Sequence, residues 1–231
     1  MKLSVVIPAL DEAERIEMAI RGAIDAPHGA AVDPDDLEVI VVDGGSSDAT
    51  RGIAASAGAR VLICERGRAR QLRAGVRECA GDVVLLLHAD TRLPAGWRSA
   101  VRVALGDPRV VGGAFRFRFD ERSLVLRFIE FGAWLRVRLW RLPYGDQALF
   151  VRRRTLESIG GIPDVPVMED LDLVQRMKRA GRLALLAAPA VTSARRYRAG
   201  GPLRTMLRHW VTAAAWSLGV DRQRIAQWAR R

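Results

Sequence analysis

The chain has 231 residues, of which 49% are hydrophobic and 27% charged, so it can bury a sizeable core and is not a disordered chain. Lys and Arg number 37 against 26 Asp and Glu, which gives a formal net charge of +11. That excess favours an anionic partner, which could be nucleic acid, a phosphorylated substrate or an anionic membrane surface, although an arginine-rich composition without a specific partner would give the same total.

The two cysteines, Cys64 and Cys79, lie outside any CxxC or Cys/His cluster. This spacing argues against a zinc site and favours small buried thiols in a reducing compartment. The apolar run at the N-terminus is too short for a secretory signal peptide, and no run approaches the about 18 apolar residues of a membrane span. We therefore expect a cytoplasmic protein.

The first ninety or so residues alternate between short apolar runs and amphipathic stretches. This alternation predicts a mostly parallel sheet flanked by helices, in which right-handed crossovers bring the strand ends to one edge. Ser46 or Ser47 is expected to cap the second helix. The predicted strands are 3–7, 37–42, 60–64 and 82–87; the predicted helices begin at Asp11, after Ser47 and at Gly67, and 27–36 is a polar loop.

Three carboxylates, Asp11, Asp43 and Asp90, follow predicted strand ends. Like charges at one edge are costly without a cation or donor partners, and ligands of such sheets bind beyond the strand ends. A nucleotide diphosphate needs a divalent cation to balance its phosphates and hydrogen-bonding groups for its base and ribose. Asp90 fits the role of cation ligand, and Asp11 and Asp43 fit the roles of binding the base and the ribose.

The second half of the chain is less regular. The segment 123–141 reads as a helix with an apolar stripe and several arginines, which could lie on a membrane or pack on the core with snorkelling arginines. Pro202 begins a final amphipathic helix. The stripe comprises Leu124, Phe128, Phe131, Leu135 and Leu139, and the final helix has Leu203, Met206, Leu207, Trp210 and Val211 on one face. The other predicted elements are a helix from 94 to 104, strands at 112–119, 148–151 and 183–187, a helix at 168–178, and loops at 142–147, 160–163 and 193–201.

Four motifs carry a resemblance to a known family. They are VVIPALDE at 5–12, VVDGGSSDAT at 41–50, HAD at 88–90 and EDLD at 169–172. In this order the chain resembles the family 2 glycosyltransferases over about residues 1 to 200, and it looks closest to a short bacterial subgroup with an HADT segment and a PYGDQ loop, here 88–91 and 143–147. The resemblance implies an α/β GT-A nucleotide-diphospho-sugar transferase fold over 1–200, with 201–231 as a helical appendage packed on the same domain.

The resemblance also implies a role for each matching residue. Asp170 would be the general base that deprotonates the acceptor hydroxyl, with Glu169 and Asp172 as supports or substitutes. The donor would lie against Pro8, Asp11, Glu12, Asp43, Ser46, Arg68, Gln71, His88, Asp90, Arg195 and Arg196; Gly145, Asp146 and Gln147 would line the acceptor side; and Asp90 with His88 would hold the metal.

Two departures from the family pattern bear on the chemistry. His88 stands where the family has the first acid of Asp-x-Asp, and imidazole suits magnesium poorly, so Mg²⁺ or Mn²⁺ is expected. Arg195-Arg196-Tyr197 stands roughly where the family has Gln-x-x-Arg-Trp, which favours a non-processive enzyme.

The implied function is metal-dependent transfer of a sugar, of the hexosyltransferase type, from a nucleotide-diphospho-sugar to a hydroxyl acceptor, with inversion. The acceptor could be lipid-linked or hydrophobic, with the enzyme peripheral at the inner face of an anionic membrane, and no specific nucleic acid is expected. Two alternatives are a nucleotidyltransferase on a similar scaffold and a catalytically inactive basic protein that binds membrane surfaces or nucleic acid.

Overall fold

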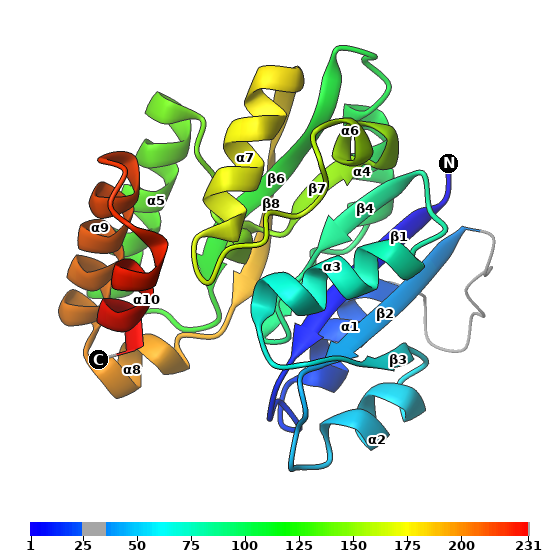
Figure 1. The fold of residues 1–231 in the computed structure, drawn as a ribbon, viewed down its shortest axis with the longest axis horizontal. Coiled ribbons are helices and arrows are strands. Elements are labelled where there is room, and N and C mark those ends of the chain that lie inside the picture. The colour runs from blue at the N-terminus through cyan, green and yellow to red at the C-terminus, as the bar shows by residue number, and fades with distance from the viewer. Residues whose placement is uncertain (25–35, 231) are drawn as a thin grey trace.

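The computed structural model describes residues 1–24 and 36–230, so the polar loop predicted at 27–36 lies outside them except for its last residue. An eight-stranded sheet runs through the molecule in the order β3-β2-β1-β4-β7-β6-β8-β5 (Figure 1). Its strands are β1 (Leu3–Ala9), β2 (Leu37–Asp43), β3 (Arg60–Ile63), β4 (Val83–Leu86), β5 (Thr91–Arg92), β6 (Val110–Phe119), β7 (Leu149–Arg152) and β8 (Arg182–Thr192).

Helices cover both faces of this sheet (Figure 1). They are α1 (Ile16–Ile24), α2 (Thr50–Ser56), α3 (Arg68–Glu78), α4 (Trp97–Ala104), α5 (Leu124–Trp140), the 3₁₀ turn η1 (Gly145–Gln147), α6 (Arg153–Ser158), α7 (Glu169–Ala180), α8 (Arg195–Gly200), α9 (Pro202–Ser217) and α10 (Arg222–Arg230). None of the described helices is both long and apolar enough to cross a membrane.

The N-terminal half of the sheet is parallel, with β1 between β2 and β4 and β3 beyond β2. Strands β1, β2 and β4 are buried on both faces, which explains their nearly continuous apolar sequences, whereas the edge strand β3 is partly exposed. Val5 and Ile7 of β1 belong to one core, whereas Val6 between them belongs to a second core on the opposite face, beside Leu72 of α3. The predicted mostly parallel α/β architecture is confirmed.

The C-terminal half mixes directions, because β7 runs antiparallel to both β4 and β6, while β8 pairs parallel with β6. In β6 the side chains of Phe115 and Phe117 are buried, and those of Arg116 and Arg118 are exposed. The predicted alternation of apolar and basic faces is therefore confirmed. Gly113 of β6 has no room for a Cβ atom beside the Ala184 carbonyl of β8, so this glycine allows the close strand pairing.

Three local predictions are wrong. The first helix begins at Ile16 and not at Asp11, because Asp11 has a left-handed backbone with a φ of 51° and a turn precedes the helix. Neither Ser46 nor Ser47 caps α2; Ala49 stands at its N-cap, and the Asp48 side chain accepts the Thr50 N–H. The predicted loop at 193–201 contains the helix α8.

The C-terminal helices depart most from the expected arrangement. Helix α9 does begin at Pro202, packs beside α5, α8 and α10, and buries Thr205, Thr212 and Ala215. Its apolar face points outward, so that Leu207 and Trp210 are 62% and 63% exposed. Helix α10 was not predicted. Four of the five predicted apolar residues of α9 therefore face outward, while Met206 packs against the core cluster of Phe117 and Phe119.

Candidate active site

A cavity of about 290 Å³ opens beyond the carboxyl ends of β1 and β4. This is the edge at which a parallel α/β sheet binds ligands. The cavity brings together seven residues that the sequence assigned to the donor, from four separate segments of the chain. Its lining is Pro8, Ala9, Leu10, Glu12, Arg66, Gly67, Arg68, Gln71, His88, Ala89, Asp90 and Arg196.

Asp11, Asp43 and Ser46 form a turn network next to the cavity but do not line it. Asp43 is fully buried, and its carboxylate accepts the N–H groups of Gly45 and Ser46, both at 2.9 Å, and the Ser46 hydroxyl. The Ser46 hydroxyl oxygen in turn accepts the Asp11 N–H at 2.9 Å. In this structure the three residues hold the ends of β1 and β2 together.

Gln71 has a similar role from α3. It is buried, and its side-chain amide donates to the carbonyls of Ala9 and Val42, both at 2.8 Å. Gln71 therefore ties the carboxyl ends of β1 and β2 to α3 next to the cavity that it lines.

Asp90 and Glu12 share one arginine. Arg195 forms a salt bridge with Glu12 and lies 3.5 Å from the Asp90 carboxylate. Burial raises the pKa of Glu12 above its ordinary value, although Arg195 opposes the shift, and its Oε2 atom has no hydrogen-bond partner. Two neighbouring carboxylates therefore share one salt-bridging arginine from α8.

Arg68 and His88 are directly bonded, with 2.5 Å between Nη2 and Nε2. Since a guanidinium can only donate, Nε2 is the acceptor and the proton of the neutral ring is on Nδ1. Burial and the nearby Arg68 charge hold the pKa of His88 well below its ordinary value. His88 is therefore a neutral acceptor that positions Arg68 at the cavity wall.

Arg68 also faces the acids at the start of α7. Its Nε lies 2.9 Å from Glu169 Oε1, which is ion-pair distance without hydrogen-bond alignment. Burial raises the pKa of Glu169, and Arg68 opposes this shift. Asp170, the next residue, accepts the Gly145 N–H at 2.7 Å. Arg68 thus connects the donor cavity to Glu169 and Asp170, two of the three predicted catalytic acids.

The acceptor-side residues lie on η1. Gln147 is buried and tied to the Phe115 carbonyl at 2.9 Å and to Arg136 at 3.1 Å. Asp146 is different, because its Oδ1 atom is buried without a partner, and burial raises its pKa to about 6. A buried oxygen without a partner and a raised pKa make Asp146 a candidate site residue.

The raised pKa of Asp146 makes a prediction for stability. Because its pKa is higher when folded than when unfolded, the stabilisation that it contributes at low pH is lost as the pH rises through about 6. Asp146→Asn should therefore raise the free energy of unfolding above about pH 7, by on the order of 2 kcal/mol, with the gain vanishing near pH 4. Urea denaturation across this range measures it.

Asp107→Asn is the matched control. Its partner Arg109 holds the pKa of Asp107 at about 2, so that group stays ionised over the same range. The change in the free energy of unfolding that Asp107→Asn causes should be the same throughout the range from about pH 5 to 8. A gain for Asp146→Asn that does not change with pH would contradict the assignment.

Asp172 and Arg195 complete the predicted set. Arg195 is the bridge to Glu12 and Asp90 already described. Asp172 does not join the cluster, because its Oδ1 accepts from Trp216 at 2.7 Å and from Arg222 at 2.8 Å. It holds α9 and α10 onto α7.

Sequence reasoning missed Arg136 and Tyr144. The Arg136 guanidinium lies 3.3 Å above the Tyr144 ring and donates to the Leu142 carbonyl at 3.0 Å. These contacts hold the acceptor-side loop against α5. One signal was available for Tyr144, because it directly precedes the predicted acceptor-side residues 145–147 in the sequence.

A metal could bind only part of the predicted set. Within residues 1–24 and 36–230, no group of three His, Cys, Asp or Glu side chains is arranged to hold an ion by itself. Magnesium needs just one or two carboxylates when substrate phosphates and water supply the rest. Asp90, beside the unpartnered Oε2 of Glu12, fits that requirement. His88 fits less well, because its Nε2 lone pair is directed at Arg68.

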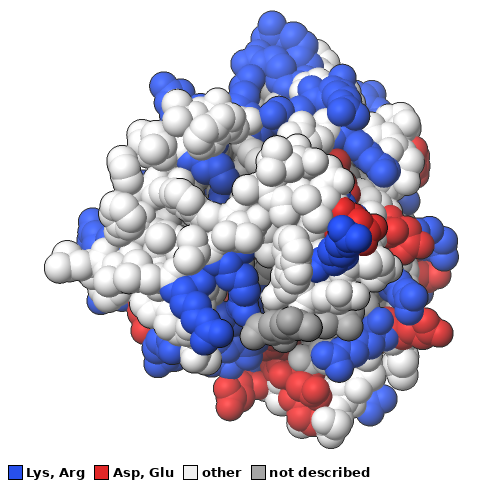
Figure 2. All heavy atoms as spheres, turned by 60° about the vertical axis from the view of Figure 1, so that its left-hand side comes forward, with Lys and Arg blue, Asp and Glu red and all other residues white. Residues whose placement is uncertain are grey.

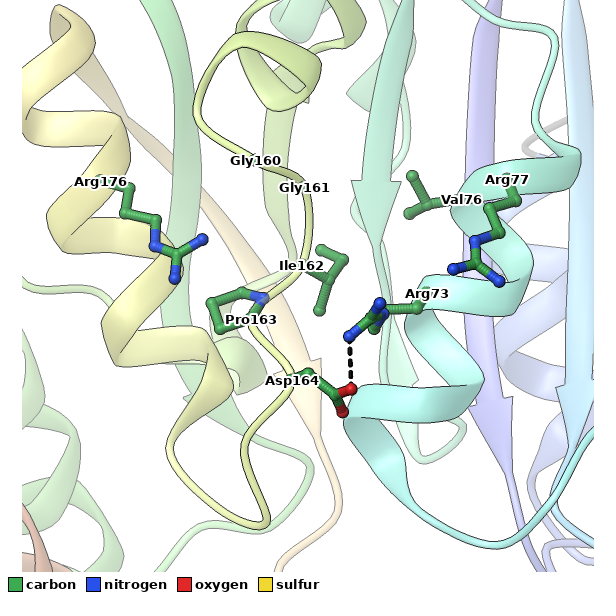
Figure 3. A pocket seen from close by; sticks show the side chains of 9 residues that line it. All are labelled: Arg73, Val76, Arg77, Gly160, Gly161, Ile162, Pro163, Asp164 and Arg176. Carbon is green, nitrogen blue, oxygen red and sulfur yellow. Dashed lines mark ion pairs between the residues drawn. The ribbon is translucent and has the colours of Figure 1, made fainter. Parts of the chain in front are cut away.

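A second cavity of about 350 Å³ lies between α3 and the loop before α7 (Figure 3). Arg73, Arg77 and Arg176 line it together with Gly160 and Asp164. Arg73 is paired with Asp164 at 2.6 Å. None of the predicted site residues lines this cavity, so the chemistry centres on the one at β1 and β4.

The comparisons with known proteins agree with this fold. The family described as Glycosyl transferase family 2 matches residues 4–160. The chain belongs to this family, which favours a glycosyltransferase over the nucleotidyltransferase alternative.

One curated protein and several solved structures are similar to this chain. The chain is 28% identical over 204 residues to the probable glycosyltransferase YdaM of Bacillus subtilis (strain 168), covering 78% of this chain and 47% of YdaM. It thus spans about half the length of that relative. Among solved structures, the chain matches glucosyl-3-phosphoglycerate synthase from Mycobacterium tuberculosis in complex with Mn²⁺, UDP and glucosyl-3-phosphoglycerate. The TM-score is 0.63 at 21% identity, and the match covers 95% of this chain and 81% of the synthase. S. aureus TarS 1-349 in complex with UDP-GlcNAc matches with a TM-score of 0.64 and 15% identity, over 84% of this chain and 58% of TarS 1-349. These likenesses support the GT-A fold.

Proposed function

We propose that this protein transfers a sugar, in a hexosyltransferase reaction, from a nucleotide-diphospho-sugar to a hydroxyl acceptor, with inversion and without processivity. The observation that carries the proposal is that Asp90 and the cationic Arg66, Arg68 and Arg196 line one cavity. Asp170 lies next to it, bonded to the Gly145 N–H beside Arg68. Positive side chains suit a diphosphate, and a carboxylate next to them suits both a cation and proton removal.

The reaction needs one proton acceptor and one stabilised leaving group. Asp170 takes the proton of the acceptor hydroxyl as its oxygen bonds to the anomeric carbon, and the bond from that carbon to the diphosphate oxygen breaks with its electron pair on the diphosphate. Arg68 and Arg196 hold the departing diphosphate. Asp90 would hold a divalent cation, Mg²⁺ or Mn²⁺, whose charge stabilises the same leaving group.

The neighbours indicate which donor to test first. Structures of related fold contain UDP with Mn²⁺ or Mg²⁺, and one contains UDP-GlcNAc. We therefore propose a uridine diphosphate sugar as the donor. Thermal shift with UDP-sugars and either metal, followed by product analysis of the anomeric configuration by NMR, tests the function. Absence of both binding and donor turnover across the sugars and nucleotides would contradict it and favour a catalytically inactive protein.

Removal of the Asp90 carboxylate tests the metal role. Asp90→Asn should weaken metal-dependent UDP binding by at least roughly 10-fold, because the cation loses its protein ligand. The thermal shift produced by UDP with Mn²⁺ should fall toward that with UDP and chelator. Asp164→Asn removes a carboxylate outside the donor cavity, next to Arg73, and is the control. Equal metal-dependent shifts in both variants would rule out Asp90 as the ligand.

The acceptor and the location of the enzyme are also proposals. We propose that the acceptor is hydrophobic or lipid-linked and that the enzyme works in the cytoplasm, peripheral to the inner face of the membrane. The apolar and basic surface of α5 and α9 supports this proposal.

A further inference from the structure

Helices α5 and α9 lie side by side (Figure 1). Both expose large apolar side chains. Their inner faces pack on a small core with Phe117 and Phe119 of β6. The outward residues, which we call the docking face, are Leu124, Phe128, Phe131, Leu135 and Leu139 of α5 with Leu203, Leu207, Trp210 and Val211 of α9.

Both helices expose large apolar side chains that an ordinary surface helix buries. Helix α9 directs Thr205 and Thr212 inward and Leu207 and Trp210 outward. Helix α5 is apolar on both sides, because its inner face buries Leu126 and Ile129 while the whole predicted stripe faces outward. Soluble proteins rarely expose large contiguous apolar patches unless a partner or a membrane covers them. The outward apolar residues on two neighbouring helices therefore indicate an interaction surface.

The charges around the docking face identify the partner. Arg127, Arg138, Arg204 and Arg208 are exposed on the two helices, and no ion pair within the described part of the chain involves them. Glu130, the one acid in the sequences of α5 and α9, accepts the Phe119 N–H and is directed to β6. Figure 2 shows a broad white area with basic side chains in and around it, and acidic side chains mostly toward the lower and right-hand edges.

We propose that the docking face binds an anionic lipid bilayer. Interfacial helices combine large apolar residues, Trp included, with Arg on their polar flanks, and each Arg near the surface gains from the negative lipid potential. A second copy of the chain would place the same arginines against one another, which like-charge repulsion disfavours.

The docking face is linked to the acceptor side of the site. Arg136 of α5 bonds to Gln147 of η1 at 3.1 Å, and Trp216 of α9 bonds to Asp172, two residues beyond Asp170, at 2.7 Å. Docking therefore sets the orientation of the acceptor-side loop and the start of α7 relative to the bilayer. The consequence, that a lipid-borne hydroxyl enters from that side, rests on the proposed function; the docking itself does not.

Flotation with vesicles tests the docking. The full chain should bind vesicles of roughly three parts phosphatidylcholine to one part phosphatidylglycerol and bind phosphatidylcholine alone far less. Phe128→Ser with Trp210→Ser should weaken binding to the anionic vesicles by at least roughly 10-fold. Ile63→Ser with Val103→Ser, equally exposed positions on β3 and α4, should leave it unchanged.

The arginines have their own pair of variants. Arg204→Gln with Arg208→Gln should weaken anionic vesicle binding by roughly 10-fold, whereas Arg77→Gln with Arg179→Gln, exposed on α3 and α7, should not. Equal binding of all variants, or no binding to either vesicle, would overturn the proposal. A dimer in solution that Phe128→Ser with Trp210→Ser dissociates, without vesicle binding, would assign the face to self-association instead.

The UDP thermal shift separates this proposal from the proposed function. Variants in the docking face should keep it, since their side chains lie outside the donor cavity. Vesicle binding by a chain that neither binds nor turns over nucleotide-sugars would overturn the function and leave the docking intact. Donor turnover by a chain that does not bind vesicles would overturn the docking and leave the proposed function intact.

Discussion

Asp170→Asn is expected to reduce glycosyl transfer by roughly 10²–10⁴-fold, the usual contribution of a general base, while UDP binding changes little. The structure favours this clean separation. Asp170 accepts the Gly145 N–H at 2.7 Å, and the amide oxygen of asparagine can keep that bond while losing the ability to take a proton. Single-turnover rates and UDP thermal shifts on the same preparation measure the two effects.

Two neighbours on α7 provide the controls. Asp172→Asn changes a carboxylate that accepts from Trp216 and Arg222, so it should lower stability slightly but leave most of the transfer rate. Glu169→Gln removes the charge that faces Arg68 and should weaken donor binding as well as transfer. Transfer by Asp170→Asn at the wild-type rate, or a loss in Asp172→Asn as large as in Asp170→Asn, would show that Asp170 is not the base.

If Asp170→Asn retains transfer, Asp146 is the next acid to test. Its Oδ1 is buried without a partner, and its pKa of about 6 is close to the pH at which a base must work. The double variant Asp146→Asn with Asp170→Asn would then lose the activity that the single variant keeps. The sequence could rank these acids only through the family resemblance, because burial and unsatisfied atoms are properties of the folded chain.

The parallel half of the fold follows from the sequence because local patterning and global position agree there. Runs such as 83–86 are apolar on both faces, and only a central strand buries both. The polar residues after each run then had to lie at one edge of the sheet, and the cavity at β1 and β4 lies at that edge. The antiparallel direction of β7 has no such local signal, because its four residues could pair either way.

What the sequence could not give is the direction of individual side chains. Asp43 and Asp90 both stand at the ends of buried strands. The Asp43 carboxylate accepts N–H groups of the turn that follows it, whereas Asp90 lines the cavity. The spacing of apolar residues located the apolar face of α9, and most amphipathic helices pack that face inward. The structure turns it outward, because the buried positions hold Thr205, Thr212 and Ala215. Periodicity reports which residues share a face, not which way the face points.

Gly145→Ala is the second variant for which we expect a large loss. A Cβ atom at Gly145 would overlap Arg68 Nη2 and lie 3.1 Å from both Asp170 Oδ2 and His88 Nε2. Arg68 would have to leave His88, and the acceptor-side loop would shift from Asp170. Since small displacements in a catalytic arrangement can cost roughly 100-fold, transfer should fall by about that factor, with weaker UDP binding. Kinetics with saturating donor and thermal shifts with UDP measure both losses.

The helix α5 supplies a matched substitution. No atom lies within 4 Å of a Cβ at Gly132, so Gly132→Ala should fold normally and gain up to about 1 kcal/mol of stability from helix propensity, with transfer unchanged. The contrast separates crowding at Gly145 from a general effect of adding a methyl group. Gly145 also shows why a glycine in a polar loop is informative: its backbone N–H binds Asp170, and its missing side chain leaves the space that the Arg68 guanidinium occupies. Wild-type transfer by Gly145→Ala would mean that Arg68 and Asp170 can separate without loss, and the connection between donor cavity and base would have no part in the reaction.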